Sequence, residues 1–171
     1  VRTDLLGLQR RARFGRFRRI PAHDVPNPKS RHRLPLGVEK DGIGSRGIGF
    51  STAPGSNATS AAEYVVSTLL LLAERDGFTL AGKRVGIVGC GNVGSRVRDR
   101  LMTLGMNCMV NDPPLQAQGG DDDDDYVSLD DMAEADVITF HVPLTRDGDW
   151  PTWHLAGRQF LERLKPGAVL V

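Results

Sequence analysis

Three glycines in the stretch RVGIVGCGNVGSRV have the spacing GxGxxG. Gly89 permits a tight turn, Gly91 removes the Cβ that would keep the backbone away from a pyrophosphate, and Gly94 lets a helix pack closely on a strand. The amides of Asn92 and Val93 would then point at the phosphates from the positive end of that helix. Because an apolar run precedes the glycines and a helical pattern follows them, the stretch predicts a dinucleotide-binding turn.

An acidic residue lies where the ribose of such a dinucleotide would need a hydrogen-bond acceptor. Asp112 comes 18 residues after Gly94, at the end of the second predicted strand. Its carboxylate could accept hydrogen bonds from the adenosine ribose hydroxyls and would repel a 2′-phosphate. Because Pro113 and Pro114 follow it instead of an arginine, the sequence predicts NAD rather than NADP. The alternative is a glycine cluster that packs a helix on a strand without a ligand.

A second group of candidate residues ends the later strand DVITFH. His141 closes this strand, and Val142 and Pro143 follow it at the edge of a parallel sheet where ligands bind. We expect Val142 and Pro143 to form a wall of the cofactor cleft. We expect the His141 side chain to hydrogen-bond to local backbone, with catalysis by its imidazole as the alternative. The sequence therefore predicts a cofactor site and no catalytic residue.

Alternating strands and helices must position these residues. Apolar runs predict strands in RVGIV, NCMVN, DVITFH and GAVLV, and apolar residues at helical spacing predict a helix from Val93 to Leu104, ended by Gly105. AGRQFLERLK predicts another helix before the last strand. Strands that alternate with helices in this way predict an α/β fold with a doubly wound parallel sheet, a Rossmann-like domain truncated at its C-terminal end.

A longer, strongly apolar helix is predicted before the first of these strands. Ser60 and Glu63 fit a capping box, and Gly77 supplies the end. A short strand and a Pro-Gly turn are expected from Gly47 up to this helix. Apolar residues cover most of its circumference: Val65, Val66, Leu69, Leu70, Leu71 and Leu72. Such a helix is predicted to be buried between layers or at a subunit interface.

The net charge of +1 conceals a basic first part. Residues 1–46 contain 12 Lys and Arg and 4 acids, whereas residues 47–171 contain 10 and 17. We interpret residues 1–46 as a mostly irregular segment, either disordered or translated out of frame. The alternative is an arm that binds nucleic acid, since Phe14 and Phe17 lie among its arginines. The predicted boundaries are 1–46, then 47–76 for the connecting strand and apolar helix, then 77–171 for the incomplete NAD-binding domain.

Composition is that of an ordinary globular protein, with 40% apolar and 25% charged residues. No apolar run approaches the roughly 18 residues that span a membrane, and no signal peptide is visible, so we expect a cytoplasmic protein. Cys90 and Cys108 are expected to be packing residues. The five aspartates Asp121–Asp125 are expected to form a solvated loop, and no metal site is predicted.

Several stretches together resemble the D-isomer-specific 2-hydroxyacid dehydrogenases. TLAGKRVGIVGCGNVGSRV, ADVITFHVPLT and LKPGAVLV match in order and spacing, and GIGFSTAPGSNATSAAEYV, LLAERDGFTL, NDPP and PLTRDGDWPTWHL match one subgroup of that family. The resemblance implies NAD-dependent oxidation of a phosphorylated 2-hydroxy acid, 4-phosphoerythronate, on the route to pyridoxal phosphate. It also implies that the glycine turn, Asp112 and the Val142 turn contact NAD, and that the helix after Ser60 helps to form a homodimer.

Two features of the sequence depart from the pattern of this family. Residues 1–46 do not match the family's substrate-binding domain, and the catalytic arginine, glutamate and histidine of the family would follow the strand that ends at Val171. The sequence therefore predicts a fragment without the catalytic residues. Two alternatives stay open: another D-2-hydroxyacid dehydrogenase of the phosphoglycerate type, or a catalytically silent nucleotide-binding module with a basic arm.

Overall fold

The computed structural model describes residue 46 and residues 52–119 and 125–171. The chain divides into two units, residues 1–52 and 53–171, and every described helix and strand belongs to the second. Phe14 and Phe17, the strand expected after Gly47, and Asp121–Asp124 lie outside the described residues. Asp125 is exposed, and its carbonyl accepts a hydrogen bond from the Val110 amide at 2.9 Å.

A parallel sheet forms the centre of the second unit. Its strands are β1 (Arg84–Val88), β2 (Asn107–Asn111), β3 (Val137–Phe140) and β4 (Val169–Leu170), in the spatial order β2-β1-β3-β4. All neighbouring strands run parallel. Order and direction confirm the predicted doubly wound fold, because each return to a parallel neighbour requires a crossover connection.

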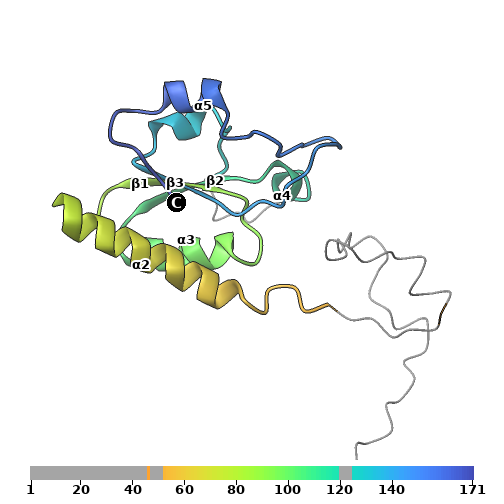
Figure 1. Cartoon of the computed structure of the whole chain (residues 1–171), viewed down its shortest axis with the longest axis horizontal. Helices are drawn as coiled ribbons and strands as arrows, with labels where there is room; N and C mark the ends of the chain where they lie inside the picture. Colours follow the sequence, from red (N-terminus) through yellow and green to blue (C-terminus); the bar gives the residue numbers. More distant parts are fainter. Residues whose placement is uncertain (1–45, 47–51, 120–124) are drawn as a thin grey trace, which may run out of the picture. The chain divides into compact units, whose positions relative to one another are not determined.

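Helices cover both faces of this sheet (Figure 1). The helices α2 (Ala58–Asp76) and α3 (Gly94–Thr103) lie on one face, and α5 (Arg158–Arg163) lies on the other. The short helix α4 (Pro113–Gln116) follows β2, and the 3₁₀ helix η1 (Asp131–Glu134) precedes β3. No helix in the described part of the chain is both long enough and apolar enough to cross a membrane.

Buried residues form one cluster on each face of the sheet. Val85 and Ile87 of β1 pack towards Leu69 of α2 and Leu101 of α3, whereas Val88 belongs to the cluster with Phe160 of α5. Successive residues of a strand point to opposite faces, so a strand covered on both faces is apolar at every position. This explains why the RVGIV run is continuous rather than alternating.

The helix α2 differs from its prediction at its start. It begins at Ala58, so the capping box expected at Ser60 and Glu63 is wrong, because a turn at Gly55 starts the helix earlier, with the Ala58 amide bonded to the Gly55 carbonyl at 3.0 Å. The end at Gly77 is confirmed, with φ +69° at this residue. Within the described unit only one side of the helix is buried, and burial of the rest at a subunit interface stays a prediction.

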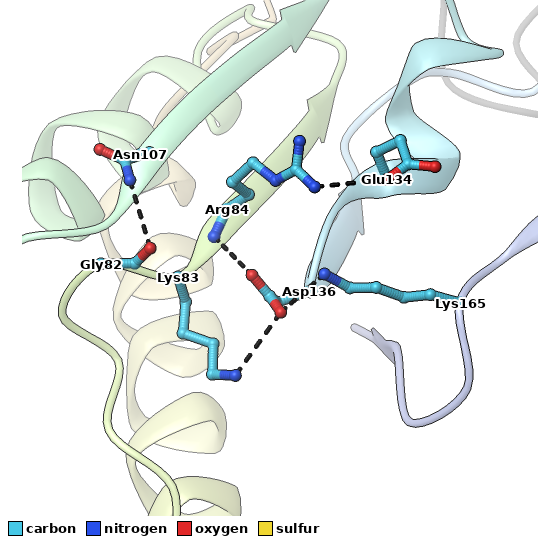
Figure 2. A network of polar contacts seen from close by, with 7 residues as sticks. All are labelled: Gly82, Lys83, Arg84, Asn107, Glu134, Asp136 and Lys165. Atoms are coloured by element: carbon cyan, nitrogen blue, oxygen red, sulfur yellow. Dashed lines mark hydrogen bonds and ion pairs between the residues drawn. The ribbon is translucent and has the colours of Figure 1, made fainter.

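A carboxylate joins the strands at the end of the sheet opposite the glycine turn (Figure 2). Asp136 accepts a hydrogen bond from the Arg84 amide at 2.7 Å, and its other oxygen lies 2.7 Å from Lys165 Nζ and 3.5 Å from Lys83 Nζ. Burial raises the pKa of Asp136, but the Lys165 and Arg84 hydrogen bonds and the two lysine charges outweigh it and lower this pKa from 3.8 to about 2. One ionised group, next to the start of β3, therefore connects the start of β1 with Lys165 in the segment between α5 and β4.

We expect Asp136→Asn to lower the free energy of unfolding at pH 7 by about 1–2 kcal/mol, moderated because the side chain is 22% exposed. Since the pKa is lower in the folded than in the unfolded chain, the unfolded chain binds the proton first. The stabilisation is therefore complete above about pH 4 and is lost as the pH falls towards about 2. Urea unfolding at several pH values measures it.

The matched control is Glu162→Gln, which removes an exposed ion pair with Arg158 on α5. Its expected effect is below about 0.5 kcal/mol at every pH. An Asp136→Asn protein as stable as the original at pH 7, or equally destabilised at pH 7 and pH 2, would contradict the role assigned to this carboxylate.

Candidate cofactor site

The turn after β1 accepts only glycine at its first position. Gly89 has φ +90°, and a Cβ built there would lie 2.7 Å from Val142 Cγ1 and 3.0 Å from the His141 backbone. Its amide donates a hydrogen bond to the Asn111 carbonyl at 2.9 Å, so the turn is held by the end of β2. The chain therefore reverses in the narrow space between the ends of β2 and β3.

The other two glycines of the motif have opposite surroundings. A Cβ at Gly94 would lie 1.9 Å from the Gly89 carbonyl oxygen. Apart from its chain neighbours, no atom of a described residue lies within 4 Å of the position that a Cβ of Gly91 would take. Backbone atoms of Gly89 fill the space beside Gly94, so a side chain cannot be accommodated there. The Gly91 site is open, so another molecule could approach the backbone there.

The helix α3 begins directly on this turn. Among the backbone hydrogen bonds of the described residues, none is donated by the amides of Asn92 or Val93, and α3 starts at Gly94. Unpaired amides at a helix start carry partial positive charge and favour a bound anion. The structure thus provides donors where the sequence predicts a pyrophosphate.

Asp112 has two backbone partners that the sequence analysis missed. One carboxylate oxygen accepts a hydrogen bond from the Cys90 amide at 2.8 Å, and the other accepts one from the Leu115 amide at 3.0 Å. Asp112 is therefore the N-cap of α4 and ties the end of β2 to the glycine turn. Since each ionised oxygen can accept a second bond, the carboxylate keeps capacity for ribose hydroxyls. The sequence signal for the cap was available, because proline at the first helical position commonly follows a capping aspartate.

His141 has a side-chain partner rather than the backbone partner that we expected. Its Nε2 lies 2.9 Å from Thr139 Oγ1, and its amide donates to the Val88 carbonyl at 2.7 Å. The expectation failed because residues two apart in an extended chain point to the same side, which brings Thr139 within reach. Burial lowers the pKa of the imidazole below its ordinary value of 6.5.

A cavity of about 700 Å³ opens at the carboxyl ends of β1, β2 and β3. Five predicted cofactor residues line it, and they are Gly89, Gly91, Asp112, Val142 and Pro143, whereas Asn92, Val93 and Gly94 are not in its wall. His141 is also in the wall. The volume is within the range of small-molecule sites. Among the described residues, no three His, Cys, Asp or Glu side chains gather to hold a metal ion.

Part of the cavity wall was not predicted. Asp149, Trp150 and Pro151, in the long loop between β3 and α5, line the cavity together with Pro113 and Pro114 of α4. The length of the PLTRDGDWPTWHL stretch was the available signal, but spacing alone does not reveal where a loop folds back.

The dimensions and chemistry of this site fit a dinucleotide. The open position at Gly91 leaves room for a pyrophosphate beside the Asn92 and Val93 amides. Asp112 lies in the same cavity wall with lone pairs for ribose hydroxyls, and the remaining wall is largely apolar, as an adenine ring requires.

Comparison with known proteins agrees with this geometry. The family described as "D-isomer specific 2-hydroxyacid dehydrogenase, NAD binding domain" matches residues 58–171. The erythronate-4-phosphate dehydrogenases of Salmonella paratyphi B and Salmonella typhi are each 52% identical to this chain over 135 residues, which are 78% of this chain and 35% of each relative. The chain thus spans about a third of the length of these curated relatives.

Solved structures show the same fold with NAD bound. The NAD-dependent formate dehydrogenase of Staphylococcus aureus in complex with NAD is 28% identical, with TM-score 0.59 over 76% of this chain and 44% of that one. The NAD+-bound 3-phosphoglycerate dehydrogenase of Entamoeba histolytica is 25% identical, with TM-score 0.59 over 78% and 43%. This chain therefore belongs to the D-isomer specific 2-hydroxyacid dehydrogenases, carries their NAD-binding domain and has NAD as its cofactor.

Proposed function

We propose that this chain is the NAD-binding part of an enzyme that oxidises 4-phospho-D-erythronate to the 2-oxo acid, on the route to pyridoxal phosphate. The 52% identity to erythronate-4-phosphate dehydrogenases supports the substrate. The geometric observation that carries the cofactor role is the open position at Gly91, beside two glycine positions that are filled. NAD supplies the hydride acceptor for such an oxidation.

In this proposal the chain's own residues bind and orient the adenosine half of the cofactor. The Asn92 and Val93 amides hold the pyrophosphate, Asp112 accepts from the ribose hydroxyls, and Val142 and Pro143 form an apolar wall. The described cavity wall contains no arginine or lysine that could hold a substrate carboxylate. Because the His141 ring nitrogen Nε2 is engaged with Thr139 Oγ1 at 2.9 Å, we assign this ring no proton transfer.

We predict that NAD binds to the chain and that Asp112→Ala weakens this binding. Loss of charged hydrogen bonds to the ribose should lower the affinity by about 10- to 100-fold. The same substitution should lower the free energy of unfolding by about 1 kcal/mol, because the helix α4 loses its cap. Calorimetric titration, with thermal unfolding in parallel, measures both effects.

Asp99→Ala, an exposed carboxylate on α3 outside the cavity, is the matched control and should leave NAD affinity unchanged. NADP should bind the original chain more weakly than NAD, and Asp112→Ala should narrow that difference. If the original and Asp112→Ala chains bind NAD with equal affinity, Asp112 does not contact the cofactor.

The substrate is tested with the product of the full reading frame that contains this sequence. We expect it to form NADH from 4-phosphoerythronate with a kcat/KM about tenfold or more above that for 3-phosphoglycerate. The 171-residue chain alone should form none, because its described cavity offers no group for the substrate carboxylate. A preference for 3-phosphoglycerate would favour a dehydrogenase of the phosphoglycerate type instead. Turnover by the 171-residue chain alone would contradict the proposal that this chain binds the cofactor without catalysing the reaction.

We also propose that α2 packs against a second copy of the chain. Tyr64 and Leu71 lie on one side of this helix and are 70% and 65% exposed. Leu71→Glu should convert a dimer to a monomer in sedimentation experiments while the circular dichroism spectrum is kept. Leu161→Glu, on α5, is the control and should leave the dimer intact. A monomeric original chain would contradict this assembly.

A further inference from the structure

The loop between β3 and α5 is closed at its base by two threonines. The Thr145 amide donates to Thr152 Oγ1 at 2.7 Å, and the Thr152 amide donates to Thr145 Oγ1 at 2.9 Å. The Thr152 hydroxyl donates in turn to the Pro143 carbonyl at 2.5 Å. These bonds fix the two ends of the loop to the segment that follows β3, so the residues between them have a defined position beside the cavity.

The loop places an indole on the cavity wall. Trp150 lines the cavity and is 47% exposed, and its carbonyl lies 3.5 Å from Thr145 Oγ1. It is the one Trp, Tyr or Phe side chain in the described cavity wall. A large aromatic side chain that is half exposed at a binding cavity is stabilised most when a flat apolar group covers its exposed face.

The second tryptophan of the chain already has partners. The Arg146 guanidinium lies 3.8 Å from the Trp153 ring centroid, and the His154 ring lies 4.6 Å from it. Trp153 does not line the cavity. No such ring contact joins Trp150 to any residue in the described ranges, so the two tryptophans differ in their ring partners and in their position at the cavity.

The position of Asp112 decides which part of a dinucleotide reaches Trp150. A ribose held by this carboxylate has the pyrophosphate on the side of the glycine turn and its base on the other side. Pro113 and Pro114, which directly follow Asp112 in the chain, line the same cavity as Trp150. The base attached to that ribose is adenine, a flat ring whose faces stack well on indole.

We propose that Trp150 stacks on the adenine ring of NAD and that the Thr145–Thr152 loop exists to hold it there. This inference rests on the proposed NAD site at the glycine turn. Stacking of a base on an aromatic side chain corresponds to about a 5- to 100-fold contribution to affinity. In this proposal Trp150 is a cofactor-binding residue that could not be predicted from the glycine motif.

Fluorescence of single-tryptophan variants tests the contact, because the chain has 2 tryptophans. In Trp153→Phe, emission comes from Trp150 alone, and AMP should quench it. In Trp150→Phe, emission comes from Trp153 alone, and AMP should leave it unchanged. Nicotinamide mononucleotide, which lacks adenine, should quench neither variant.

Calorimetry provides the second measurement. Trp150→Ala should bind AMP and NAD about 5- to 100-fold more weakly, whereas Trp150→Phe should stay within about threefold of the original chain. Trp153→Ala should bind both as the original does. Thermal unfolding of each variant checks that the fold is kept.

The outcomes separate this inference from the proposed function. If the original chain binds NAD and AMP, but Trp150→Ala binds them equally well or AMP fails to quench Trp150, the stacking contact is overturned and the NAD site stands. If the original chain binds neither nucleotide, the proposed function fails and the inference fails with it.

Discussion

The contact between Gly94 and the Gly89 carbonyl oxygen is the constraint on which the site depends. A side chain at residue 94 would begin 1.9 Å from that oxygen, which is backbone and has no room to move. The helix α3 can therefore start directly above the end of β1 only if residue 94 is glycine. Because α3 starts there, the amides of Asn92 and Val93 lie at the N-terminal end of this helix, where we propose that the pyrophosphate binds.

Different interactions occupy the two ends of the sheet. At the end where the strands begin, the Asp136 carboxylate bonds to the Arg84 amide, Lys83 and Lys165, and none of these residues lines the cavity at the other end. At the end where they finish, Gly89 and Asp112 leave space and acceptors for a ligand. The oxygens of Asp112 accept hydrogen bonds from the Cys90 and Leu115 amides, and the residue also lines the cavity. The proposed NAD site would therefore couple stability and binding at this one residue.

The fold class could be predicted because its signals are local. The RVGIV run, the GxGxxG spacing and the helical spacing of Val97 and Leu101 each lie within a few residues of one another. The features that were missed or wrong depend on contacts that no local pattern determines. The start of α2 depends on a turn at Gly55, the His141 partner depends on strand geometry, and Trp150 reaches the cavity because the bonds between Thr145 and Thr152 close the loop.

The central claim is that the open side of Gly91 receives the pyrophosphate of NAD, and Gly91→Ala tests it most directly. In the part of the chain that the structure describes, only the chain neighbours of Gly91 lie within 4 Å of the added methyl group, so the variant should fold and unfold as the original chain does. Calorimetric titration with NAD should nevertheless show an affinity lower by about tenfold or more, because the methyl group occupies the space of the phosphates. A stable Gly91→Ala chain that binds NAD as tightly as the original would contradict the account.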